Sequence, residues 1–172
     1  QRKQRFSMKL TGPGRIEYMQ SIFPDARFVN VVRDPVVTVR SLLAVPFWKD
    51  LGMHQLWWTG AYSEEELARF ESLKSDPIAA TAYQISKVLR TTQDEARQCE
   101  ANLLTVRYED FVANPTPIVG DICSFLDLSV SVSAALQQKL RQTAVHDRNQ
   151  RKPKSEEFSE QEILAVIAEL GL

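Results

Sequence analysis

RFVNVVRDPVVTVRS, residues 27–41, is the stretch that decides the fold. Its first part, residues 28–32, is a short apolar run rich in β-branched residues, which is typical of a strand buried on both faces of a parallel sheet. Asp34 is a good N-cap and Pro35 suits the first helical position, so a helix is predicted to begin there. The predicted unit is therefore a strand, an immediate turn and a helix. Such turns lie at the carboxyl ends of strands, where open α/β sheets bind ligands.

Two polar residues flank this turn. Arg33 ends the strand and offers a planar fork of donors that matches phosphate oxygens. Ser41 lies about two helical turns further on and adds a hydroxyl. In the alternative interpretation, Arg33 pairs with a carboxylate and Ser41 is merely tolerated in its helix. The pair alone leaves both interpretations open, since short motifs give many false positives.

Length and composition are those of an ordinary globular domain. The chain has 172 residues, 44% of them hydrophobic and 25% charged, which is enough for one domain with its own core over residues 1–172. A net charge of −1 argues against general nucleic-acid binding. No stretch reads as a membrane span or a signal peptide, so a cytoplasmic protein is expected. The two cysteines and two histidines give no metal-ligand spacing, and no metal is expected.

The remaining elements follow from local patterns. A strand is predicted over residues 6–11, before the turn at Gly12-Pro13-Gly14. A second strand is predicted at 103–106, where four apolar or β-branched residues follow one another. Helices are predicted over residues 15–23, 63–73, 76–100, 118–126, from Ser131 or Ser133 to about 143, and 158–170. The predicted class is α/β with a parallel sheet and a helix-rich C-terminal half.

The pattern around the central turn extends to the residues before it: FPDARF at 23–28, then VVRDP at 31–35, then Ser41. This series resembles the sulfotransferases that use 3′-phosphoadenosine 5′-phosphosulfate (PAPS). In that family an arginine and a serine eight positions later hold the 3′-phosphate of the cofactor. The resemblance therefore implies that Arg33 and Ser41 bind the cofactor.

A second segment is similar to the same family: VRYEDF at 106–111, then Asn114-Pro115, then FLDL at 125–128. It resembles the family's RYEDL…P…FLGL region, whose tyrosine lies near the adenosine of the cofactor. The resemblance implies that Tyr108 binds the nucleotide. Glu109 and Asp110, from their position, are expected to favour the N-terminus of the helical turn that follows.

The candidates for catalysis are Lys9 and His54. Lys9, in MKLTGP at 8–13, looks like the family's K-x-P segment. The resemblance implies that its ammonium faces the oxygen bridging sulfate and phosphate, where it would stabilise charge on the leaving phosphate. The alternative is a solvated lysine near a loop. His54 is the candidate base, although the family's histidine lies close to the lysine segment and Thr11 occupies that place here.

Two further segments each allow two interpretations. Residues 44–62 contain all three tryptophans without a clean period. By resemblance this segment would line an acceptor pocket, and the alternative is a satellite hydrophobic cluster under a long loop. Residues 141–154 carry five Lys or Arg residues against one acid. By resemblance this stretch would fold over the 3′-phosphate, and the alternative is a solvated linker.

The resemblance implies a three-layer α/β domain of the P-loop nucleotide-binding type. It implies sulfuryl transfer from PAPS to a hydroxyl or amine of a small-molecule or carbohydrate acceptor, without a metal. The family's domains begin with a phosphate-binding loop, but this chain contains no GxxxxGK[ST] pattern. We therefore expect either the C-terminal two-thirds of such a domain or a non-catalytic nucleotide-binding or scaffold protein that has lost the loop. A nucleoside-phosphate kinase would need the loop and Mg²⁺-holding acids, and neither is evident.

Overall fold

A computed structural model describes residues 5–142 and 158–171. Its sheet has two parallel strands, β1 (Arg27–Val32) and β2 (Asn102–Arg107). The register pairs Arg27 with Asn102 at one end and Val32 with Arg107 at the other. Both strands therefore end at the same level. The predicted parallel sheet is confirmed in this reduced form.

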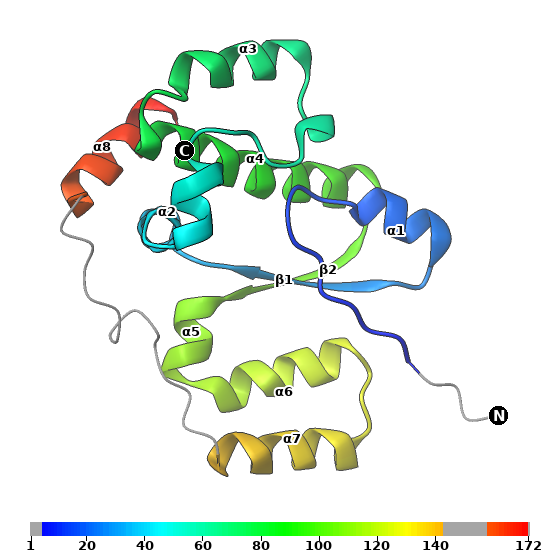
Figure 1. Cartoon of the computed structure of the whole chain (residues 1–172). Coiled ribbons are helices and arrows are strands. Elements are labelled where there is room, and N and C mark those ends of the chain that lie inside the picture. Colours follow the sequence, from blue (N-terminus) through cyan, green and yellow to red (C-terminus); the bar gives the residue numbers. More distant parts are fainter. Residues whose placement is uncertain (1–4, 143–157, 172) are drawn as a thin grey trace.

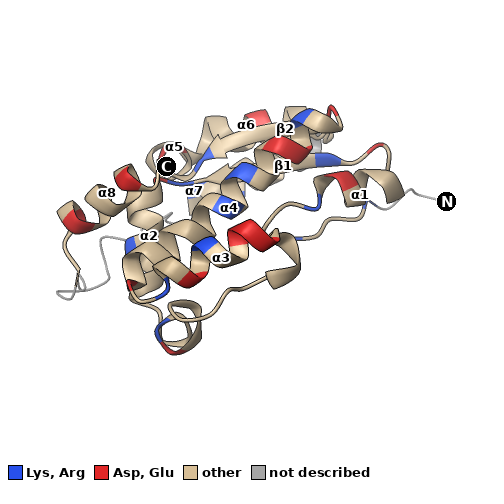
Figure 2. Ribbon diagram, turned by 90° about the horizontal axis from the view of Figure 1, so that it is seen from above, with Lys and Arg blue, Asp and Glu red and all other residues tan. Residues whose placement is uncertain are grey.

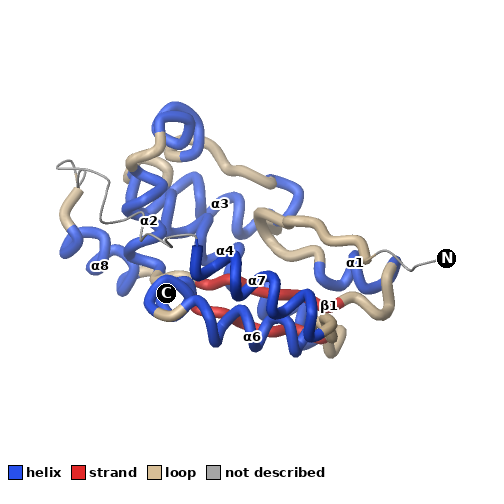
Figure 3. The backbone as a smooth tube through the Cα atoms, turned by 90° about the horizontal axis from the view of Figure 1, so that it is seen from below, coloured by secondary structure: helices blue, strands red, loops and turns tan. Residues whose placement is uncertain are grey.

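Helices lie on both faces of the sheet (Figure 1). One face carries α1 to α4 and α8, and the other carries α5, α6 and α7. In Figure 3, which is seen from below, α6 and α7 lie in front of the strands. The helices are α1 (Ile16–Ile22), α2 (Pro35–Leu43), α3 (Glu64–Leu73), α4 (Pro77–Gln98), α5 (Tyr108–Ala113), α6 (Pro115–Phe125), α7 (Val130–Gln142) and α8 (Glu160–Glu169). A π-helical turn, η1 (Trp48–Gly52), and a 3-10 turn, η2 (Thr59–Ala61), lie between α2 and α3. No helix of the described residues has the length and apolar character of a membrane span.

Three helices begin where local capping signals predict. The Asp34 carboxylate accepts a hydrogen bond from the Val37 amide at 2.9 Å, ahead of α2. Ser63 forms a capping box with Glu66 ahead of α3. Asp76 caps α4 by accepting from two backbone amides of its first turn. In each case a short polar side chain satisfies amides that have no partner within the helix.

The main core lies between α2, α4 and α8. Trp48 and Met53 belong to this core, and Trp57 packs against it. The Trp48 indole is buried and donates to the Thr81 hydroxyl at 2.9 Å. These residues of the segment 44–62 are thus part of the core, whereas Phe47 and Leu51 of the same segment are 51% and 47% exposed. The other buried members are Val36, Val39, Leu43, Ile78, Ala82, Ile163 and Ile167.

Two expectations about strands are wrong. Residues 6–11 form an irregular extended segment, with Phe6 76% and Met8 52% exposed. No strand of the described chain pairs with this segment, so its backbone forms no ladder. β1 is not buried on both faces either, because Val31 is 62% exposed. The sheet of the described residues has only two strands, so β1 lies at an edge, and each of its residues is half-buried or exposed.

Candidate functional site

The carboxyl ends of the two strands bring Arg33 and Tyr108 together. Each residue directly follows one member of the last register pair, Val32 and Arg107. The Arg33 guanidinium lies over the Tyr108 ring, with its Cζ atom 4.9 Å from the ring centroid. A cation–π contact of this kind contributes about 0.5–2 kcal/mol, depending on how far it is desolvated. Two residues singled out in separate motifs thus form one local arrangement.

The next residue in each segment makes a second contact. Glu109 Oε1 accepts a hydrogen bond from the backbone N–H of Asp34 at 2.9 Å. This bond holds the pKa of the Glu109 carboxyl below its usual range, with smaller contributions from the positive charges of Arg107 and Arg33. The expectation that Glu109 acts on its own helix missed this contact. The sequence places Glu109 just after a strand end, but only the register of the two strands puts it beside Asp34, and the sequence does not show that register.

The start of α2 is fixed by several bonds to Asp34. Its carboxylate caps the helix, and its carbonyl accepts from both the amide and the hydroxyl of Thr38, at 2.9 and 2.8 Å. Ser41 follows Thr38 by about one turn and is half-buried. At about 100° per residue, Ser41 lies on the side of α2 opposite the buried Val39 and Leu43.

This arrangement fits an anionic group. Arg33 supplies a permanent positive charge at the strand end, and the N-terminus of the nine-residue helix α2 adds the positive end of its dipole. The guanidinium is held on an aromatic ring, so it is oriented before a ligand arrives. Elsewhere charge is mixed, and Figure 2 shows basic and acidic residues interspersed along the helices in that view.

The two predicted catalytic residues are not joined to this arrangement. Lys9 is exposed in the irregular N-terminal segment, and His54 is exposed in the turn after η1. Within residues 5–142 and 158–171, no hydrogen bond or ion pair links either side chain to Arg33 or Tyr108. Their catalytic roles stay predictions.

Two other expectations concern basic residues and metals. Arg141 is exposed near the end of α7, and the rest of the basic stretch, 143–154, lies outside the described residues. The described part of the chain holds no cluster of three or more His, Cys, Asp or Glu side chains that could bind a metal ion.

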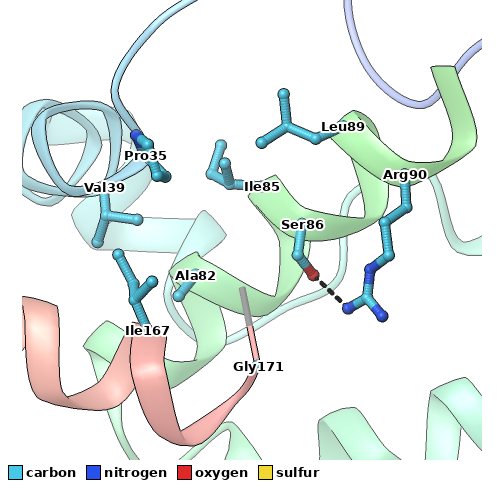
Figure 4. A pocket seen from close by; sticks show the side chains of 9 residues that line it. All are labelled: Pro35, Val39, Ala82, Ile85, Ser86, Leu89, Arg90, Ile167 and Gly171. Atoms are coloured by element: carbon cyan, nitrogen blue, oxygen red, sulfur yellow. Dashed lines mark hydrogen bonds between the residues drawn. The ribbon is translucent and has the colours of Figure 1, made fainter. Parts of the chain in front are cut away.

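A separate apolar cavity of about 230 Å³ lies between α2, α4 and α8 (Figure 4). Its polar side is formed by Ser86 and Arg90. The Arg90 guanidinium donates to the Ser86 hydroxyl at 2.9 Å, and that hydroxyl donates to the Tyr83 carbonyl at 2.8 Å. Val39 lines this cavity, so the cavity lies on the core side of α2, away from Ser41. The other lining residues are Pro35, Ala82, Ile85, Leu89, Ile167 and Gly171.

Comparison with known proteins gives one family match. A family model with the description "Sulfotransferase family" matches residues 10–132, which is more than half of the chain. The matched range contains Arg33, Ser41, Tyr108 and Glu109, and it begins one residue after Lys9. No curated protein and no solved structure matches the chain.

Proposed function

The chain belongs to the sulfotransferase family, and from that premise we propose that it transfers a sulfuryl group from PAPS to a hydroxyl or amine of a small-molecule or carbohydrate acceptor. Family membership implies a transferase with PAPS as donor. The observation that carries the proposal is the Arg33 guanidinium held over Tyr108 at the carboxyl ends of both strands. The proposed domain is of the three-layer P-loop nucleotide-binding type, with helices on both faces of the sheet.

In this proposal the strand-end residues bind and orient the nucleotide. Arg33 would hold the 3′-phosphate by paired charge-assisted hydrogen bonds, with the hydroxyl of Ser41 as a further donor. Tyr108 would support the guanidinium and border the adenosine. PAPS, when bound, supplies the sulfuryl group and a phosphate leaving group. Lys9 would stabilise negative charge on that phosphate, and His54 is the proposed acceptor of the proton from the attacking hydroxyl or amine.

A second candidate function is nucleotide binding without catalysis. It is favoured by the positions of Lys9 and His54, which are both exposed and not bonded to the strand-end residues. The two functions differ in what happens to PAPS when an acceptor is present. An enzyme converts PAPS to 3′-phosphoadenosine 5′-phosphate (PAP), and Lys9→Ala lowers that rate while the affinity for PAP is kept. A binding protein leaves PAPS intact.

The test of the nucleotide site is calorimetric binding of PAP and of 5′-AMP, which lacks the 3′-phosphate. We expect the full-length protein to prefer PAP, and Arg33→Ala to lose most of that preference. A hydrogen bond to a charged group contributes about 1.5–3 kcal/mol, so the loss should be at least about tenfold. Arg97→Ala is the matched control, because Arg97 is an exposed arginine of α4 whose carboxylate partner is Asp94 of the same helix. Equal, weak binding of both nucleotides by the intact protein would refute the proposal.

A further inference from the structure

Two adjacent residues of one segment contact two adjacent residues of another. The Tyr108 ring lies under the Arg33 guanidinium, and the next residue, Glu109, accepts from the backbone N–H of Asp34. We propose that Glu109 is a positioning residue, which fixes the Arg33–Asp34 peptide and thereby sets Arg33 for recognition of the 3′-phosphate. This inference rests on the proposed function.

The bond from Asp34 acts on Arg33 through the peptide plane. The N–H that donates to Glu109 belongs to the peptide group whose carbonyl comes from Arg33. A peptide group is planar, so holding its nitrogen 2.9 Å from Oε1 also holds the direction in which the chain leaves the Arg33 Cα atom. Without this bond, the turn after β1 loses one of the contacts that orient it.

The ring contact completes the arrangement. An arginine side chain has many rotamers, and this freedom is lost when the side chain binds a ligand in one geometry. Resting on Tyr108, the Arg33 guanidinium has already lost part of that freedom. Orientation before binding raises affinity because less of this entropy is lost on binding. Backbone and guanidinium are thus positioned by consecutive residues, Glu109 and Tyr108.

The role of Glu109 lies in accepting a hydrogen bond and does not require its charge. A carboxylate near Arg33 partly offsets the positive charge that a phosphate would meet. Oε1 is occupied by the Asp34 amide, and the ion pair recorded for Oε2 is with Arg107 Nε at 3.8 Å. A glutamine has the same length and keeps an acceptor oxygen. The inference therefore predicts that Glu109→Gln preserves recognition and that a side chain unable to reach Asp34 does not.

The experiment compares PAP and 5′-AMP binding by calorimetry in the full-length protein and three variants. Glu109→Ala should reduce the preference for PAP by about tenfold while the affinity for 5′-AMP stays unchanged. Glu109→Asp keeps the charge but shortens the reach, and it should lose the preference in the same way. Glu109→Gln should stay within about threefold of the intact protein. Asp110→Ala, at the exposed neighbouring position, is the control and should leave the preference for PAP unchanged.

The outcomes distinguish failure of the proposed Glu109 role from failure of the proposed function. An intact protein without preference for PAP contradicts the proposed function. An intact protein that prefers PAP, together with Ala and Asp variants that keep this preference, overturns the role of Glu109 alone. A parallel loss of PAP and 5′-AMP binding with lowered thermal stability would indicate a merely structural residue and would also overturn it. If Glu109→Ala does not fold, the Asp and Gln pair still decides the question.

Discussion

Helix α2 borders two regions that are built in different ways. Its core side carries Val39 and Leu43, both with no exposed surface, which pack in one cluster with Ile163 of α8. Its N-terminal end meets polar groups, where Asp34 caps the helix and donates to Glu109. The core side is held by burial of apolar area and the strand-end turn by individual hydrogen bonds. Stability and proposed recognition therefore have separate sources, and substitutions on the two sides should have separate effects.

The largest effect is expected in the core. Ile163→Ala should lower the free energy of unfolding by about 2–5 kcal/mol, because Ile163 has no exposed surface and its truncation leaves a cavity. Chemical denaturation measures this change. The control is Leu164→Ala, one residue on, where the side chain is 57% exposed and the change should stay within about 0.5 kcal/mol.

The same variant tests whether the two regions are independent. Where Ile163→Ala is folded, its preference for PAP over 5′-AMP should equal that of the intact protein. A folded Ile163→Ala protein that no longer distinguishes the two nucleotides would show that the core also shapes the strand-end turn. The separation of stability from recognition would then be wrong.

A smaller loss of stability is expected at the turn. Asp34→Ala removes the side chain that accepts from the Val37 amide, and loss of such a cap costs about 0.5–2 kcal/mol. Asp34→Asn is the matched control, since asparagine caps a helix about as well. Urea unfolding of both variants makes the comparison. If the two variants are equally destabilised, the carboxylate charge would matter more than the capping bond.

The start of α1 shows why some contacts could be predicted from sequence and others could not. The residue directly before each of α2, α3 and α4 caps that helix. These residues are Asp34, Ser63 and Asp76, so the local sequence predicts where the three helices begin. At α1 the N-cap residue, Arg15, makes no side-chain capping bond. Glu95 of α4 accepts from the Ile16 amide at 2.6 Å instead. That contact spans 79 positions, and no local pattern encodes it.

The candidate site divides in the same way. Arg33 and Tyr108 each follow a predicted strand, so their placement at one edge of the sheet follows from parallel pairing. The bond between Glu109 and Asp34 depends on the exact register of the two strands, which a single sequence does not show. The prediction of a strand at 6–11 was wrong because it, too, depended on a contact with a distant segment. Its apolar residues suit a strand, but a strand also requires a neighbour with which to pair.

The smallest predicted effect is the pH dependence of the Glu109 contact. The hydrogen bond from the Asp34 amide lowers the pKa of Glu109 in the folded protein below its ordinary value of 4.5. Between these two values the unfolded chain binds more protons than the folded one, so acidification favours unfolding. The contribution of the ionised Glu109 to the free energy of unfolding is therefore present above about pH 4.5. It disappears as the pH falls through the lower pKa of the folded protein. We expect less than about 1 kcal/mol, because the side chain is 38% exposed and solvent screens its interactions.

The measurement is the difference in unfolding free energy between the intact protein and Glu109→Gln, taken from pH 7 down to pH 3. On acidification the intact protein should lose unfolding free energy relative to Glu109→Gln, because the carboxylate at position 109 takes up a proton and the glutamine side chain does not. Glu66, Asp127 and Glu162 also have lowered pKa values, but they are present in both proteins and cancel. A difference that stays constant with pH would mean that the Asp34 amide does not hold the Glu109 carboxylate in solution. In that case the strand-end turn would rely on its other contacts, among them the Asp34 cap and the Tyr108 ring.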